Sequence, residues 1–348
     1  MSLSAMSLFF ALLGSQSHPY IKACIRLLLC LISASVLYDL NLHGQDWVNY
    51  NTIFTSNDDE LYYYYEPLFS LFMYLLLFIS SGSYDVAVFI FYFIVIIYLC
   101  YIFEFFDMAV EYWLFVVIFS LGSTLFTDQL RQLMATCFVV TAFLFFIKNN
   151  CVFSKTVIFF IIIATLSHYS AIFSLLVFTF SRVDKKSKLI FLSSVLISLS
   201  LMFQSSSLLS YINLLPFNTY KIEYYLSISS GYNWGPLTLL SFFYVIYFIC
   251  FSRCNVYHNI YFCAAVMQLS VVSIFPGLFR FIVYNIVIGS VACAYYFSSK
   301  KFFEKLITIK LFNNFIVWMY LIVVFTSYYY AQNGGDNQID FWYIPFVE

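Results

Sequence analysis

Long unbroken apolar stretches are the feature that most limits what this chain can fold into. Two of them, 112–126 and 133–147, are separated only by the short polar stretch 127–132. Over the whole chain 63% of the residues are hydrophobic and 9% are charged, whereas a soluble domain carries about 25% charged residues. Since lipid offers backbone groups no hydrogen-bonding partner, such stretches must satisfy their own backbone as helices. The sequence therefore predicts an all-α polytopic membrane protein.

The apolar stretches divide the chain into about 11–13 transmembrane or half-membrane helices. No internal repeat or low-complexity linker separates them, so we expect a single integral membrane domain over 1–348. The helices are expected at 2–14, 21–38, 66–80, 86–103, 111–126, 130–147, 156–167, 169–181, 188–203, 236–251, 257–275, 279–297 and 311–330.

Lysines and arginines in short loops mark the cytoplasmic side of a membrane protein. On this rule the stretches 39–65 and 204–235 are external loops, and Arg131 and Arg280 lie near the external face. The residues that mark the cytoplasmic side are Lys22, Arg26, Lys148, Lys155, Arg182, Lys185, Lys186, Lys188, Arg253, Lys300, Lys301, Lys305 and Lys310.

One segment conflicts with simple alternation of sides. Basic residues flank 156–181 at both ends. Both flanks can be cytoplasmic only if this segment enters the membrane and returns, which broken helices do where they line a protein-walled cavity. We therefore predict two half-helices that meet at Ser167-His168. The short stretch 66–80 is a second candidate for a re-entrant helix.

Three groups that carry or can acquire positive charge lie at the mouths of apolar helices: Arg131, Arg280 and His168. An arginine keeps its charge at physiological pH, and placing it at the bilayer centre costs roughly 2.5–3.5 kcal/mol on insertion scales. Its planar guanidinium can donate two hydrogen bonds to a phosphate. Arg131, followed by Gln132, therefore predicts a polyanion site, with Asp128 as a candidate ion-pair partner. The alternative is that these side chains reach lipid headgroups and bind no substrate.

Two carboxylates stand out in and just after the first external loop. Asp46 lies near aromatic residues, and Glu66 opens an apolar helix together with Pro67. Carboxylates beside aromatic faces suit sugar rings, and a carboxylate or His168 could also move a proton. Glu66 has a structural alternative, because its carboxylate can stabilise the positive end of its helix electrostatically. His168 has one as well, because a membrane histidine can form a hydrogen bond to a neighbouring helix. The acidic run 58–60 is typical of a solvated loop.

Motifs for nucleotides and metals are missing from the sequence. It contains no G-x-x-x-x-G-K-[ST], G-x-G-x-x-G, H-E-x-x-H or G-x-S-x-G pattern. Its nine cysteines form no C-x-x-C pair, and most lie inside apolar stretches. We therefore expect no metal, no cofactor and no nucleic-acid partner.

Four short patterns occur in a fixed order in the first half of the chain, with the form G-x-D-x-x-x-Y, E-x-x-F, R-Q-x-x-A and H-x-S-A. Together they resemble the EpsG-like family, which are Wzy-type membrane polymerases of bacterial exopolysaccharide and O-antigen. Where the family usually has glycine or an aromatic residue after the glutamate, this chain has Pro67. The matching residues are Gly44, Asp46 and Tyr50; Glu66 and Phe69; Arg131, Gln132 and Ala135; and His168, Ser170 and Ala171.

The resemblance implies a GT-C-like inverting glycosyltransferase in the bacterial inner membrane, with its active site facing the periplasm or exterior. It would join repeat units carried on undecaprenyl diphosphate into O-antigen or exopolysaccharide without a metal. Arg131, Gln132 and Arg280 would bind the diphosphate, and Asp46, Glu66 and His168 would be catalytic. Its partners would be undecaprenyl-diphosphate-linked glycans, membrane lipids and a chain-length regulator protein.

Two other classes of function stay open on sequence grounds. A lipid-linked oligosaccharide flippase would also place arginines in a cavity, but it usually has repeat symmetry. A membrane acyltransferase that modifies surface glycans would need a histidine or serine near a donor on the cytoplasmic side, whereas His168 is expected near the external face.

Overall fold

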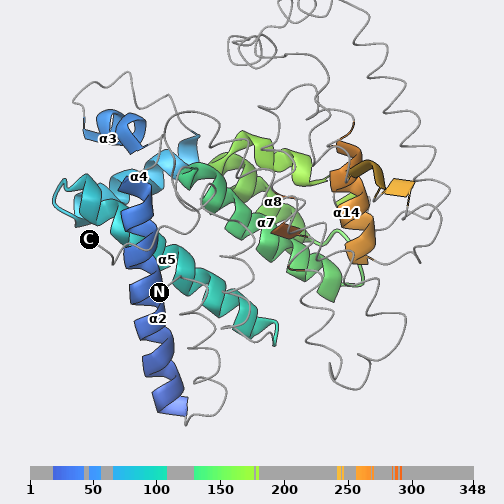
Figure 1. The fold of residues 1–348 in the computed structure, drawn as a ribbon, viewed down its shortest axis with the longest axis horizontal. Coiled ribbons are helices and arrows are strands. Elements are labelled where there is room, and N and C mark those ends of the chain that lie inside the picture. Colours follow the sequence, from blue (N-terminus) through green and yellow to red (C-terminus); the bar gives the residue numbers. More distant parts are fainter. Residues whose placement is uncertain are drawn as a thin grey trace, which may run out of the picture. The chain divides into compact units, whose positions relative to one another are not determined.

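The computed structural model describes residues 19–42, 47–55, 66–107 and 129–175, together with short pieces of the second half (178–179, 241–243, 245–246, 256–267, 269, 284, 287–288 and 291). Every regular element labelled in these residues is a helix (Figure 1). The chain divides into two compact units, and α14 (Val256–Met267) lies in the second. The other α-helices described below belong to the first unit.

Among the residues that the structure describes, two helices are long and apolar enough to cross a membrane. They are α5 (Tyr84–Phe105), with 22 residues, and α7 (Leu130–Lys148), with 19. At 1.5 Å per residue they extend about 33 and 29 Å, close to the roughly 30 Å of a bilayer's hydrocarbon core. These helices agree with the predicted helical membrane protein.

Two other apolar helices, α4 (Pro67–Ile79) and α8 (Lys155–Ser167), have only 13 residues each. That length extends about 20 Å, which is too short to cross the core. Half-membrane helices were predicted at both places. The structure confirms short helices there, with α4 packed against α5 and α8.

The helix break expected at Ser167-His168 is confirmed. The α8 helix ends at Ser167, and the next residue leaves the helical backbone with φ −160° and ψ 118°. The chain then makes the 3-10 helix η2 (Tyr169–Phe173), in which the N–H of Ala171 donates to the carbonyl of His168 at 2.9 Å. The α-helix predicted from residue 169 is therefore wrong over η2, because the extended residue forces the chain to restart with a tighter turn.

The helices α7 and α8 pack together as an antiparallel hairpin (Figure 1). In its turn, Asn149 Nδ2 donates to Ser154 Oγ at 3.2 Å, and the same oxygen accepts from the N–H of Val157 at 3.4 Å. Ser154 therefore caps the start of α8. Because the hairpin folds back on itself, the first turn of α7 lies beside the last turn of α8.

Another antiparallel pair is formed by α2 (Pro19–Leu42) and α5. Each step forward along α2 is matched by a similar step back along α5. The pairs that set this register are an ion pair of Arg26 and Glu104 at 2.9 Å, the sulfurs of Cys30 and Cys100 at 3.8 Å, and the rings of Tyr38 and Phe89 at 6.4 Å.

One helix of the structure was not predicted. The stretch 39–65 was expected to be an external loop, but α2 continues to Leu42 and α3 (Trp47–Thr55) follows. The apolar spacing of Trp47, Tyr50 and Phe54 makes one face of α3 apolar, and Tyr50 and Phe54 are buried. That spacing is short and interrupted by polar residues, which explains why it was overlooked.

The other predicted helices compare as follows. Those at 21–38, 86–103, 130–147 and 156–167 correspond to α2, α5, α7 and α8, and the one at 257–275 corresponds to α14 as far as Met267. Those at 2–14, 111–126, 188–203 and 311–330 lie outside the described residues, as does most of 236–251 and 279–297.

The α2–α5 register makes a direct prediction. In a variant that keeps only Cys30 and Cys100, oxidation by copper phenanthroline should join the two thiols, because their sulfurs are 3.8 Å apart. Maleimide labelling of the purified protein should then fall for both thiols and return after dithiothreitol.

A variant that keeps Cys24 and Cys100 is the matched control. Cys24 lies on the same helix but about 9 Å further along its axis, so it should stay labelled under the same treatment. Equal crosslinking in both variants would contradict the register.

Candidate functional site

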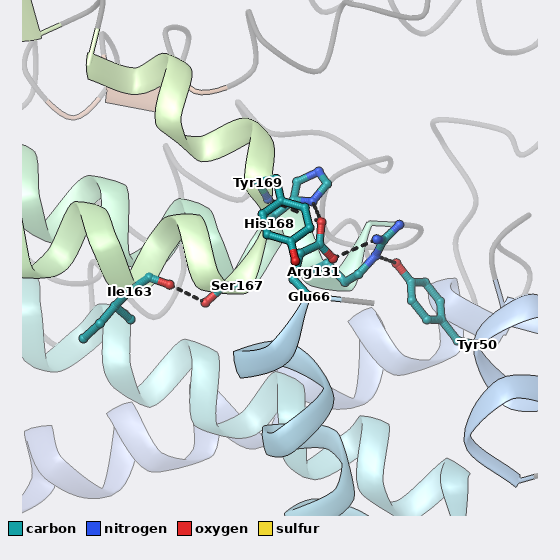
Figure 2. A network of polar contacts seen from close by, with 7 residues as sticks. All are labelled: Tyr50, Glu66, Arg131, Ile163, Ser167, His168 and Tyr169. Atoms are coloured by element: carbon teal, nitrogen blue, oxygen red, sulfur yellow. Dashed lines mark hydrogen bonds and ion pairs between the residues drawn. The ribbon is translucent and has the colours of Figure 1, made fainter. Parts of the chain in front are cut away.

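Three helix ends meet in the first unit and bring distant polar residues together. Glu66 precedes α4, Arg131 lies in the first turn of α7, and His168 follows the end of α8. Figure 2 shows the Glu66 carboxylate between the other two side chains. The sequence separations are 65 residues from Glu66 to Arg131 and 102 from Glu66 to His168. Packing of the helices, not proximity in sequence, therefore builds this cluster.

The local sequence sets the direction of Glu66. Pro67 occupies the first position of α4, where its missing N–H costs nothing. A residue before proline is pushed toward extended backbone, and Glu66 has φ −62° and ψ 141°. Its side chain makes no capping hydrogen bond to α4. The carboxylate therefore serves the cluster and does not act as a hydrogen-bonding cap.

Each oxygen of Glu66 has its own donors. Oε2 accepts from Arg131 Nη1 at 2.9 Å. Oε1 lies 2.6 Å from His168 Nδ1 and accepts from the N–H of Tyr169 at 3.4 Å. The side chains of Glu66, Arg131 and His168 are 5%, 15% and 12% exposed. Glu66 is thus a buried bridge between a permanent cation and an imidazole.

Arg131 has a further partner that sequence reasoning overlooked. Its Nε donates to the hydroxyl of Tyr50 at 3.2 Å, and its Cζ lies 6.0 Å from the centre of that ring. Tyr50 comes from α3 and is only 2% exposed. Tyr50 is the last residue of the G-x-D-x-x-x-Y pattern, and this pattern is the sequence signal that could have identified it as a site residue.

The charge state of Glu66 follows from its surroundings. Burial alone would raise the pKa of this carboxyl, but the hydrogen bond with His168 and the charge of Arg131 together lower it to about 2. Glu66 lies ahead of α4, outside the two helices that are long enough to cross a membrane. It is therefore ionised at neutral pH and pairs with Arg131 as a carboxylate.

The remaining predicted site residues fall into two groups. Gln132 follows Arg131 in α7 and is 1% exposed. Its backbone carbonyl accepts a hydrogen bond from Thr136 Oγ1 at 2.7 Å. Asp46 and Arg280 lie outside the described residues. Asp128, the ion-pair partner suggested for Arg131, lies outside them as well, and the carboxylate found beside Arg131 is Glu66.

Two chemical capacities meet in this cluster. A guanidinium in a dry setting can bind phosphate oxygens strongly. An imidazole held at Nδ1 by a carboxylate has a fixed orientation and can use Nε2 for hydrogen bonding or proton transfer. Within the described part of the chain, no group of three His, Cys, Asp or Glu side chains is placed to hold a metal ion.

Comparison with protein-family models gives a match to the EpsG family over residues 22–337. Comparisons with curated proteins and with solved structures found no match. The matched range includes Tyr50, Glu66, Arg131 and His168, and it covers most of the chain. The match supports a polysaccharide-polymerase-like role in a membrane protein. On this evidence the chain belongs to the EpsG family.

Proposed function

We propose that this protein joins oligosaccharide repeat units carried on undecaprenyl diphosphate into O-antigen or exopolysaccharide. It would act as an inverting glycosyltransferase at the external face of the bacterial inner membrane, with a GT-C-like multi-pass fold. The observation that carries the proposal is the buried Arg131, paired with Glu66 beside His168 at the ends of three apolar helices. Family membership supports the polymerase class.

The leaving group sets the first chemical requirement. When the bond from the anomeric carbon to the diphosphate breaks, negative charge grows on the phosphate oxygens. Arg131 is the proposed donor to those oxygens, with Gln132 and Arg280 as further donors. Because Arg131 is only 15% exposed, its charge is poorly screened by water and acts strongly on the transition state. With arginines supplying this charge, the proposal requires no metal ion.

The acceptor sets the second requirement, since its hydroxyl must lose a proton as it attacks. A base works best when its pKa is near the working pH, and the pKa of Glu66 is about 2. We therefore assign Glu66 to hold His168 through Nδ1 and assign His168 Nε2 to take the proton. Asp46 is the second candidate base, from the segment just before α3.

The proposed step is a single displacement. The acceptor oxygen attacks the anomeric carbon on the face opposite the diphosphate, so the new glycosidic bond forms while the bond to phosphate breaks. The proton passes to the base, and undecaprenyl diphosphate leaves with the electron pair.

Membrane lipids and a chain-length regulator protein are the expected partners.

Replacing Arg131 tests the diphosphate role. Arg131→Ala should lower turnover by roughly tenfold to a hundredfold, because a charge-assisted hydrogen bond contributes roughly 1.5–3 kcal/mol. Arg131→Lys should recover only part of the activity, since lysine lacks the planar fork. The assay follows glycan length with purified protein and lipid-linked repeat units isolated from a strain that lacks the polymerase.

Arg26→Ala is the matched control for this series. It also removes an arginine from an ion pair, with Glu104, but that pair joins α2 to α5 away from the cluster. Arg26→Ala should retain near-normal chain extension. Full-length product from Arg131→Ala at normal protein abundance would refute the assignment.

A second prediction concerns the proton. Glu66→Gln and His168→Gln should each reduce kcat by roughly 10²–10⁴, and the double variant should be little worse than either alone, because the residues act as a unit. Protein abundance and detergent stability are measured alongside turnover. If kcat is normal in His168→Gln but falls in Glu66→Gln, Glu66 and not His168 is the general base. If kcat falls only in Asp46→Asn, Asp46 is the base.

A further inference from the structure

Tyr50 is the part of the cluster that the proposed mechanism does not yet use. It is buried, it reaches Arg131 from α3, and its hydroxyl accepts the Nε–H of the guanidinium at 3.2 Å. Figure 2 shows Tyr50 and Glu66 on different sides of that guanidinium. The two acceptors therefore constrain the plane of the Arg131 side chain together.

Aromatic packing holds Tyr50 in place. Its ring meets Phe69 of α4 edge to face, with ring centres 5.9 Å apart. One turn later, Phe54 packs against the same Phe69 at 6.0 Å, and Trp47 at the start of α3 lies 4.9 Å from Tyr84 of α5. A short helix fixed by such contacts can hold one hydroxyl at a defined position.

The position of the Tyr50 hydroxyl affects how the Glu66 carboxylate pairs with the Arg131 guanidinium. Glu66 Oε2 accepts from Arg131 Nη1, whereas Oε1 lies against His168 Nδ1 and accepts from the N–H of Tyr169. A guanidinium and a carboxylate can also pair through two parallel hydrogen bonds. If the Nε–H lost its contact with Tyr50, it would gain by turning to Glu66, which would draw both Glu66 oxygens toward Arg131.

We propose that Tyr50 is a positioning residue that keeps Arg131 in a one-oxygen pair with Glu66, so that the guanidinium can donate to a lipid-linked diphosphate. This inference rests on the proposed function, in which Arg131 binds the diphosphate. With a two-oxygen pair, Glu66 would neutralise the cation more completely and compete with phosphate oxygens. Tyr50 thereby also preserves the contact between Glu66 and His168.

A double-mutant cycle on ligand binding tests this role. The probe is undecaprenyl diphosphate itself, and its dissociation constant is measured with purified full-length protein in nanodiscs. Tyr50→Phe keeps the ring against Phe69 and removes only the hydroxyl. It should weaken binding about tenfold when Arg131 is present and leave binding nearly unchanged in the Arg131→Ala background.

Tyr98→Phe is the matched control, because Tyr98 in α5 also loses a buried hydroxyl contact, 2.6 Å from Thr141 of α7. It should leave the dissociation constant unchanged in both backgrounds. Equal weakening by Tyr50→Phe in both backgrounds, or none in either, would overturn the positioning role. If Arg131→Ala alone binds the probe as the wild type does, the diphosphate site of the proposed function is refuted as well.

Discussion

The carboxylate of Glu66 is the group that joins the three helix ends of the polar cluster. A guanidinium at the end of an apolar helix carries a large desolvation cost unless a partner repays it. Glu66 provides that partner for Arg131 at 2.9 Å and holds His168 at 2.6 Å with its other oxygen. One side chain therefore compensates a buried cation and orients an imidazole, and it ties the start of α4 to the start of α7 and the end of α8.

The short helices explain why such a cluster can exist inside a largely apolar protein. Both α4 and α8 have only 13 residues, and helix ends leave backbone groups without intrahelical partners. Here the N–H of Tyr169, just past the break, donates to Glu66.

The sequence predicted the parts of this arrangement better than their assembly. Unbroken apolar stretches located α5 and α7 within two residues, and the basic flanks of 156–181 located the break at His168. Glu66, Arg131 and His168 were each singled out by an unusual charge beside an apolar helix. Their contact was not predictable, because it depends on how three helices pack, and Asp128 was the nearer carboxylate in sequence. Tyr50 and α3 were missed because their apolar spacing is short, and Asp46 and Arg280 lie outside the described residues.

Thermal unfolding of the purified protein, compared among four forms, tests the central pairing most directly. Glu66→Gln should lower stability by about 3–5 kcal/mol, because it removes the carboxylate that pairs with the buried charge of Arg131. Arg131→Gln should have a similar cost. The double variant should be clearly more stable than the sum of the two losses implies, since both charges are then gone. Losses that simply add would contradict the account, because they would mean that Glu66 and Arg131 act independently.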